Sequence, residues 1–383
     1  MKITDKFFTK EPCNTGRQFE FDVFKFILIY RLAIVHVFVD GTPPALLDVP
    51  GIPYYFDSIV GGVIGPTRFM IAMGVGLVYS RHGSPKQVFQ RGIKIGIIGI
   101  ILNVFRYLIP SLVGYGISGN VEKYITPLPY LFFGNDILQF ASLAMIVMSL
   151  LLYLKLNPLK ILAVGLGLSI LGTVFNNVDF HNNVLNVIMG HIIGVETVSG
   201  DPYIYSDFPL LTWFIFYAFG YVLGHCHQRL KSKDLFYNTV CPICIVISVA
   251  FCAWEFFGGF GMMMGEGANV FYHMNTIEAI ICILACVGFL IIPFHLSKII
   301  PEKLKKPIES VSRNINSIYC IHWVIVYWTV DMLIYNIKGD PYLEPIPAYF
   351  LGLAITIISM LLAEAWSQIK IKYKRKKAYE KER

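Results

Sequence analysis

Apolar segments long enough to cross a lipid bilayer recur from one end of the 383-residue chain to the other. A membrane-spanning helix needs about 20 apolar residues, because each residue adds about 1.5 Å across a hydrocarbon layer about 30 Å thick. The chain is 55% hydrophobic and only 15% charged, well below the charge of a soluble domain. The sequence therefore predicts an all-α, polytopic membrane protein with about ten transmembrane helices, at 20–39, 59–79, 94–113, 135–154, 159–177, 208–226, 238–258, 274–294, 314–335 and 346–369.

Positive charge alternates along the segments outside these predicted helices. Counted from the N-terminal tail, every second such segment is basic. Together with Lys94 and Lys160, which stand at the adjoining ends of two predicted helices, these segments carry 26 Lys and Arg residues, against 2 in the intervening segments. Cytoplasmic loops carry the excess of Lys and Arg, so both termini are predicted to be cytoplasmic. We expect a multi-pass protein of the plasma membrane with a cytoplasmic tail at 1–19, one transmembrane domain at 20–369 and a basic cytoplasmic tail at 370–383.

A basic tail and a His-Cys-His motif are both interpreted as lipid contacts. The basic tail "KIKYKRKKAYEKER" directly follows the last predicted helix, a position that favours contact with anionic lipids over nucleic acid. The "HCH" motif at 225–227 stands beside Arg229 and Lys231, which favours contact with lipid headgroups over metal binding. The sequence leaves the oligomeric state open, and no metal is expected because no zinc-site spacing occurs.

Ionisable residues concentrate within the first three predicted helices. In "FDVFKFILIYRLAIVHVFVD", residues 21–40, a helical period puts Asp22, Lys25 and His36 on one face and Arg31 on the opposite face. Arg68 and Arg106 fall within the second and third predicted helices. An unpaired arginine in mid-membrane costs at least about 2.5 kcal/mol, so these residues need protein, water or an anion around them. The pattern favours a path for an anionic substrate, with a purely structural charge network as the alternative.

A second histidine lies near the start of the ninth predicted helix, in "SVSRNINSIYCIHWVIVYW". Helical spacing aligns Ser312, Tyr319 and His322 on one face. A lone buried histidine is commonly a satisfied core residue, whereas a neighbouring tyrosine favours a reaction centre. Both interpretations of this face stay open at the level of sequence.

These residues carry a resemblance to a known family. A basic residue followed by ten residues and then a histidine, here Lys25 and His36, resembles the acyltransferase-3 superfamily of membrane acyltransferases, in which arginine usually takes the first position. "FDVFKFILIYRLAIVH" and "GPTRFMIAMGVGLVYSRHGSPKQVFQRGIKIGIIGIILN" are similar to its heparan-α-glucosaminide N-acetyltransferase-like branch. "SRNINSIYCIHW" resembles the late Ser, Tyr, His pattern of the superfamily.

The resemblance implies that an acyl group, most simply acetyl, passes from a cytoplasmic acyl-CoA to a carbohydrate or other cell-envelope acceptor outside. It also implies functional roles for five residues of this chain, Asp22, Lys25, His36, Tyr319 and His322. Arg31, Arg68 and Arg106 are candidates on charge alone. No cofactor beyond acetyl-CoA or another acyl-CoA as donor is expected.

The depth of each residue suggests how such a transfer would proceed. The basic connection at 81–94 holds Arg81, Lys86, Arg91 and Lys94, which with Lys25 could bind the phosphates of coenzyme A. His36 is predicted to act as the general base, or as a nucleophile that carries the acyl group. Arg68, Arg106 or Asn103 could stabilise the oxyanion. The sequence does not choose among these three, nor between direct transfer and double displacement.

Two other classes of function compete with this interpretation. A secondary transporter of an anionic small solute would also need intramembrane cations, and Gly76, Arg81 and Gly83 match the basic loop of major-facilitator carriers. Ser80 replaces the usual acid of that loop, however, and no repeat of one half in the other is visible. A non-catalytic scaffold would leave the intramembrane cations unexplained.

The long outer connection at 178–207 contains no Lys or Arg. It combines aromatic and acidic side chains that would suit a sugar, although an aromatic belt at the headgroup level explains the tyrosines equally well. Its centre, "NVLNVIMGHIIG", is predicted to form a short interfacial helix. The residues concerned are Asp179, Glu196, Asp201, Tyr203, Tyr205, Asp207 and Phe208.

Overall fold

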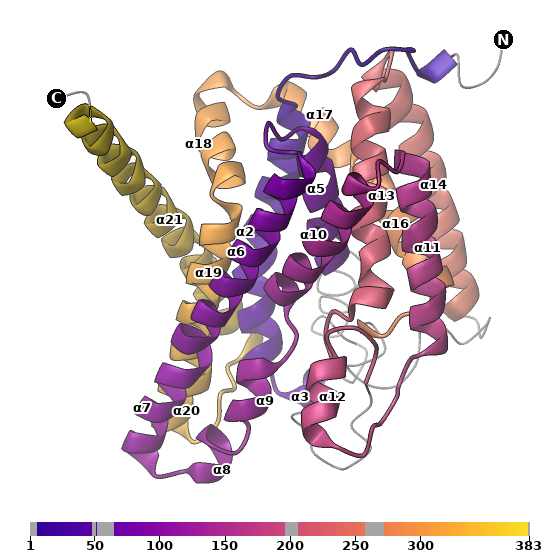
Figure 1. Cartoon of the computed structure of the whole chain (residues 1–383). Helices are drawn as coiled ribbons and strands as arrows, with labels where there is room; N and C mark the ends of the chain where they lie inside the picture. Colours follow the sequence, from indigo (N-terminus) through magenta and orange to yellow (C-terminus); the bar gives the residue numbers. More distant parts are fainter. Residues whose placement is uncertain (1–5, 48–50, 52–64, 196–205, 257–271, 382–383) are drawn as a thin grey trace. The chain divides into compact units, whose positions relative to one another are not determined.

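The computed structural model describes residues 6–47, 51, 65–195, 206–256 and 272–381 of the chain (Figure 1). Within these residues the secondary structure is helical, with isolated β-bridges and no strand. The chain divides into two compact units. Unit 1 comprises Met1–Gln18, Gly61–Val104 and Glu122–Ile292, and unit 2 comprises Phe19–Val60, Phe105–Val121 and Pro293–Arg383.

Several helices are suited to a lipid environment. By length and hydropathy, five described helical segments could cross a membrane: Pro85–Ser118, Lys233–Trp254, Thr276–Ile299, Ile315–Lys338 and Pro345–Lys377. Shorter apolar helices occupy Pro66–Val78, Ile137–Tyr153 and Pro158–Val174. Each predicted range coincides with a described helix over much of its length. The apolar helices indicate a membrane protein, while the count of ten spans and the location of the termini stay predictions.

Unit 1 is built from helices whose starts the sequence marks clearly. Asp136 caps α10 by accepting a hydrogen bond from the backbone N–H of Ile137 at 2.6 Å, and Asn157 caps α11 through Lys160 at 2.9 Å. Asn275 and Glu278 form a capping box at the start of α16. The helices are α5 (Pro66–Val78), α6 (Pro85–Asn103), α8 (Val121–Tyr124), α9 (Leu128–Phe133), α10 (Ile137–Tyr153), α11 (Pro158–Val174), α12 (Asn183–Met189), α13 (Leu210–Gln228), α14 (Lys233–Phe256) and α16 (Thr276–Phe289).

Glycines bring the backbones of α5 and α13 into direct contact. A Cβ atom on Gly74 would lie 2.3 Å from the carbonyl oxygen of Tyr217, and one on Gly220 would lie 2.2 Å from that of Ile71. Neither position can accept a side chain unless the helices separate. Such contact between small residues is a usual way to pack helices in lipid, where the hydrophobic effect does not drive them together.

The described part of the N-terminal tail lies on unit 1 along the turn between α13 and α14. The backbone N–H groups of Cys13 and Asn14 donate to the carbonyl of Gln228 at 2.7 and 2.9 Å, and that of Thr9 donates to Arg229 at 2.8 Å. A helix leaves its last carbonyls without intrahelical partners. The tail therefore caps the C-terminal end of α13.

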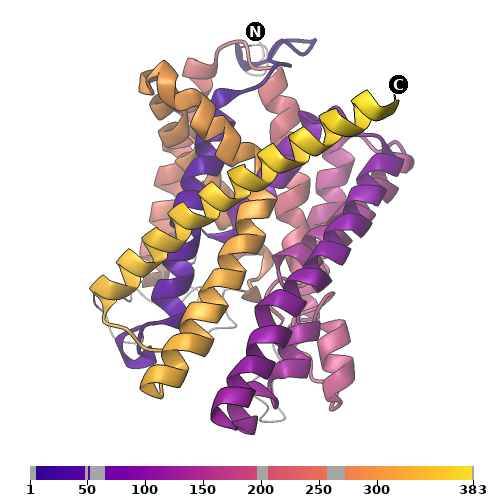
Figure 2. The ribbon, with the colours of Figure 1, turned by 90° about the vertical axis from the view of Figure 1, so that its left-hand side faces the viewer.

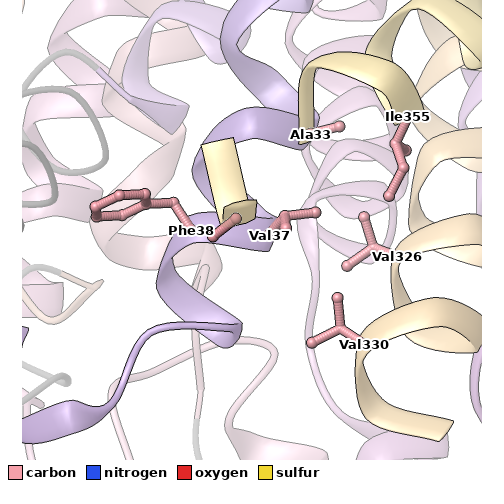
Figure 3. Close-up of a cluster of buried hydrophobic side chains, with 7 residues drawn as sticks. Ala33, Val37, Phe38, Val326, Val330 and Ile355 are labelled. Atoms are coloured by element: carbon pink, nitrogen blue, oxygen red, sulfur yellow. The ribbon is translucent and has the colours of Figure 1, made fainter. Parts of the chain in front are cut away.

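Unit 2 is an assembly of long helices around an apolar cluster. Its helices are α2 (Phe19–Asp40), α3 (Pro44–Leu47), η2 (Val104–Leu108), α7 (Ile109–Ser118), α17 (Ile291–Ile299), α18 (Glu302–Arg313), α19 (Ile315–Val326), η3 (Tyr327–Ile334), α20 (Tyr335–Lys338) and α21 (Pro345–Lys381). Helix α21 lies against α2 and α19 and crosses α19 obliquely (Figure 2). In the cluster Val37, Val326 and Ile355 point toward one another (Figure 3). Burial of this kind holds α2, α19 and α21 together.

Candidate active site

The candidate site lies within unit 2, where α2 meets α19. Helix α2 carries His36 one turn before its end, and α19 carries Tyr319, His322 and Trp323. A spacing of three residues puts Tyr319 and His322 on one face of α19, as the sequence predicted. Their rings meet edge to face with centroids 5.3 Å apart.

Three rings from the two helices form the centre of the site. The imidazoles of His36 and His322 stack with centroids 5.5 Å apart, and the Trp323 ring lies 4.0 Å from His36 and 5.3 Å from His322. His322 is 1% exposed and Tyr319 is buried, whereas His36 and Trp323 are half-buried. The two histidines that lie 286 positions apart in the sequence are thus brought into contact. We call these four residues the imidazole cluster.

The backbone of α19 determines which nitrogen of His322 carries a hydrogen. Nδ1 of His322 lies 3.3 Å from the carbonyl oxygen of Ile318, one turn earlier. A carbonyl oxygen only accepts hydrogen bonds, so a neutral ring carries its hydrogen on Nδ1 and a lone pair on Nε2. Nε2 is buried and has no hydrogen-bond partner among the residues that the structure describes. This nitrogen is therefore available as a base.

Arg106 adds a buried positive charge to the imidazole cluster. Its guanidinium lies over the ring of Tyr107 at 4.1 Å and over that of Trp323 at 4.8 Å, measured to the ring centroids, and the residue is 1% exposed. Both distances fall within the range of cation–π attraction. Arg106 lies on the π-helical turn η2, and another described π-helical segment, η3, begins directly after α19.

Pro110 gives a local reason for the π-helical turn at Arg106. A proline lacks a backbone N–H, and its ring collides with the carbonyl four residues earlier. That carbonyl belongs to Arg106, so the helix widens there instead of continuing regularly. Sequence reasoning treated this segment as an ordinary helix, although Pro110 was a visible signal. Single π-helical turns often occur at functional sites.

Two carboxylates, the buried Asp22 and the half-buried Glu364, attach α18 to its neighbours in unit 2. The hydroxyl of Ser312 donates to Oδ1 of Asp22 on α2 at 2.6 Å, and both residues are buried. On α21, Glu364 accepts from the hydroxyl of Ser310 and from the amide of Asn314. Ser312 lies in the last turn of α18, directly before α19. Its contact with Asp22 therefore helps to hold in place the helix that carries Tyr319 and His322.

The other predicted residues of α2 lie in the same unit as the imidazole cluster. Lys25 and Arg31 are both half-buried on α2. Lys25 precedes His36 by eleven residues, which corresponds to roughly 16 Å along the helix axis. Their proposed contacts with an anionic substrate stay predictions.

The remaining predicted basic residues belong to unit 1. Arg68 lies in the first turn of α5, is 1% exposed, and its guanidinium lies 3.4 Å from the ring centroid of Phe289. The first residues of the predicted second helix, 59–64, lie outside the described residues. The expected position of Arg68 in the middle of the membrane is therefore untested. Arg81 precedes α6, which carries Arg91 and Lys94; Arg81 and Lys94 are exposed and Arg91 is half-buried.

Two side chains of unit 1 have structural partners. The amide nitrogen of Asn103, a candidate for oxyanion stabilisation, donates to the carbonyl of Phe132 at 2.7 Å. His227 of the "HCH" motif is 1% exposed, and its Nδ1 lies 2.8 Å from the hydroxyl of Tyr79. The expected contact of this histidine with headgroups is therefore wrong, because packing of α13 against α5 buries the ring.

Hydrogen bonds join residues within the described part of the connection at 178–207. Asp179 accepts from the amide of Asn186 and from the backbone N–H of His181, each at 2.8 Å, and these bonds lower the pKa of the Asp179 carboxyl. The predicted short helix is present as α12, Asn183–Met189. Glu196, Asp201, Tyr203 and Tyr205 lie outside the described residues, so a sugar-binding role for them is untested.

A buried histidine joins this connection to the segment before α16. Nε2 of His273 lies 2.8 Å from the hydroxyl of Ser206, and its Nδ1 lies 2.8 Å from Oδ1 of Asn177. His273 and Ser206 are 5% and 1% exposed. Burial lowers the pKa of His273. Within the described residues, no group of three His, Cys, Asp or Glu side chains is placed to hold a metal ion.

Sequence reasoning missed the role of Trp323 in the cluster. The residue stands next to His322 on α19. Adjacent residues on a helix point about 100° apart, so spacing alone argued against a common site. Trp323 belongs to the cluster because the ring of His36 on α2 packs against the rings of both His322 and Trp323.

The chain matches a known protein family over most of its length. The family model described as an acyltransferase domain, acyltransferase-3, covers residues 18–365. No curated protein and no solved structure matches the chain. The matched range includes the imidazole cluster, Arg106 and all the helices named above except the end of α21. The chain therefore belongs to the acyltransferase-3 family.

Proposed function

We propose that this protein transfers an acyl group, most simply acetyl, from acyl-CoA to a carbohydrate or other cell-envelope acceptor on the outer face of the plasma membrane. Membership of the acyltransferase-3 family supports acyl transfer and does not favour the transporter alternative. The similarity of the first helix to the heparan-α-glucosaminide N-acetyltransferase-like branch makes an amino sugar a suitable acceptor probe.

One observation carries the proposal: the buried Nε2 of His322, which has a free lone pair beside a second imidazole and a guanidinium. Acyl transfer needs a base for the hydroxyl or amine of the acceptor. The contact of Nδ1 with Ile318 keeps the ring in the tautomer that can act as this base. The proposed base is thus His322, whereas the sequence alone favoured His36.

The proposed reaction is a direct transfer. Nε2 of His322 takes the proton of the acceptor hydroxyl or amine while the acceptor oxygen or nitrogen attacks the thioester carbonyl carbon. The carbon–sulfur bond then breaks, and the proton passes to the sulfur of coenzyme A. His36 and Tyr319 orient the His322 ring through the stacked and edge-to-face contacts.

The basic residues have separate proposed roles. Arg81, Arg91 and Lys94 of unit 1 bind the phosphates of coenzyme A, for which exposed or half-buried cations are suited. Lys25 contacts the donor, as the family resemblance implies, and Arg31 and Arg68 favour the passage of an anion. Asp22 positions α18 through its hydrogen bond with Ser312.

The proposal is tested with purified protein, acetyl-CoA as the donor and glucosamine as the acceptor probe. The protein should release coenzyme A thiol only when both are present, and acetyl-CoA alone should raise its melting temperature. Arg91→Ala and Lys94→Ala should weaken donor binding, and so should added salt. Lys160→Ala, at an exposed basic position on α11, is the matched control and should bind the donor like the parent. Failure of acetyl-CoA and longer acyl-CoA donors to bind would contradict the proposal.

A further inference from the structure

The tryptophans of the described structure differ in how their indole N–H groups are satisfied. Nε1 of Trp213 donates to the carbonyl of Tyr272 at 2.8 Å, and Nε1 of Trp328 donates to that of Phe105 at 2.9 Å. Nε1 of Trp323 is buried and has no hydrogen-bond acceptor among the described residues. An indole N–H can only donate, so its position calls for an acceptor from outside the described chain.

The unsatisfied N–H belongs to the imidazole cluster. The Trp323 ring touches His36, with centroids 4.0 Å apart, and lies 5.3 Å from His322. The cluster therefore holds two buried polar atoms without partners among the described residues, a base on His322 and a donor on Trp323. Acyl transfer requires this pair of functions, because a proton leaves the acceptor while negative charge develops on the carbonyl oxygen.

The guanidinium of Arg106 strengthens the donor. It lies over the indole ring, 4.8 Å from the centroid, so its charge draws electron density from the ring and makes the N–H a better hydrogen-bond donor. A cation in this place also favours an oxygen that becomes negative over one that stays neutral. The carbonyl oxygen of the thioester fits this better than a hydroxyl of the acceptor.

We propose that Trp323 is a catalytic residue that donates its indole N–H to the thioester carbonyl oxygen of the acyl donor and stabilises the oxyanion during transfer. As the acceptor attacks, the carbon–oxygen double bond opens and its electron pair moves to the oxygen that faces Nε1. When the carbon–sulfur bond breaks, the double bond returns, and the thiolate takes the proton held by His322. This assignment rests on the proposed function, and it adds an oxyanion donor that the sequence did not suggest.

The test compares two tryptophans that differ in their hydrogen bonding. Trp323→Phe keeps an aromatic ring beside His36 and Arg106 but removes the N–H. Its melting temperature should match that of the parent, because no protein hydrogen bond is lost, and its kcat should fall by about 10²–10³-fold, as when an oxyanion donor is removed. Its KM for acetyl-CoA should change little, because the interaction forms mainly in the transition state.

Trp213→Phe is the matched control, since Trp213 lies in unit 1 and has a satisfied N–H. It should lower the melting temperature and leave kcat per folded molecule at the parental value. Replacement of Trp323 by 3-benzothienylalanine, in which sulfur takes the place of the N–H, should reproduce the loss of kcat without a change of shape.

The outcomes separate this inference from the proposed function. A Trp323→Phe protein with parental kcat would overturn the inference, and the proposed function would stand if His322→Gln is inactive. A loss of activity that only follows a lowered melting temperature, or one confined to KM, would also overturn it. A parent protein that releases no coenzyme A thiol from acetyl-CoA with glucosamine would overturn both.

Discussion

The hydrogen bonds of single side chains determine what those side chains can do in this protein. His322 has a defined tautomer because a carbonyl one turn earlier faces its Nδ1. Asp22, for which a place near the donor stays a prediction, accepts a hydrogen bond from the hydroxyl of Ser312. Residue type and spacing identified both positions, whereas their hydrogen-bond partners come from the structure alone.

Removal of the Ser312 hydroxyl should destabilise unit 2. In Ser312→Ala the buried carboxylate of Asp22 loses this donor, which should cost about 1–3 kcal/mol. Ser297→Ala is the control, because that hydroxyl bonds the carbonyl of Phe294 within its own helix. Unfolding in mild detergent with added denaturant measures the difference. Equal stability of the two variants would show that the contact with Asp22 contributes nothing.

His273 should make the stability of unit 1 depend on pH. Burial lowers the pKa of the folded histidine below the value of about 6.5 in the unfolded chain. The unfolded chain therefore binds a proton that the folded protein excludes, so stability should fall as the pH drops below about 6.5. Melting temperatures of the parent and of His273→Gln between pH 8 and pH 5 test this. Parallel curves for the two proteins would contradict the prediction.

At the scale of the helices, some features could be predicted from the sequence and others could not. Long apolar runs identified the helices, and the caps at Asp136, Asn157 and Asn275 are readable from the sequence. The π-helical turns were not predicted, because apolar periodicity does not distinguish them from regular α-helix. The sequence also could not show that α2 places His36 against His322 and Trp323, since such contacts depend on how separate helices pack.

Straightening the helix at η2 should reduce activity without loss of stability. Pro110→Ala restores an N–H that can bond the carbonyl of Arg106, and it removes a helix-interior proline that costs about 3 kcal/mol. We expect a higher melting temperature together with a fall in kcat of up to about 10²-fold, because Arg106 moves from its place over Trp323.

Pro307→Ala is the control for that experiment, since Pro307 lies inside α18 and not next to a π-helical turn. It should raise the melting temperature and leave kcat unchanged. A Pro110→Ala protein with parental kcat would show that the widened turn has no part in catalysis.

At the scale of the whole molecule, charge distribution makes a topological prediction. The 26 to 2 asymmetry in Lys and Arg favours ten crossings with both termini in the cytoplasm. Cysteine accessibility to a membrane-impermeant reagent tests it, with single cysteines introduced at Gly119 and at Lys377 into a cysteine-free background. The first should react from outside and the second only after permeabilisation. A C-terminal position that reacts in intact cells would reject the count.

The central claim is that the imidazole cluster of unit 2 performs acyl transfer. The most direct test measures kcat for coenzyme A thiol release, from acetyl-CoA with glucosamine, and melting temperature on the same preparation of His322→Gln. We predict a fall in kcat of at least about 10²-fold, as expected for loss of a general base, with the melting temperature and acetyl-CoA binding retained. A His322→Gln protein that transfers acetyl groups at the parental rate would contradict the account.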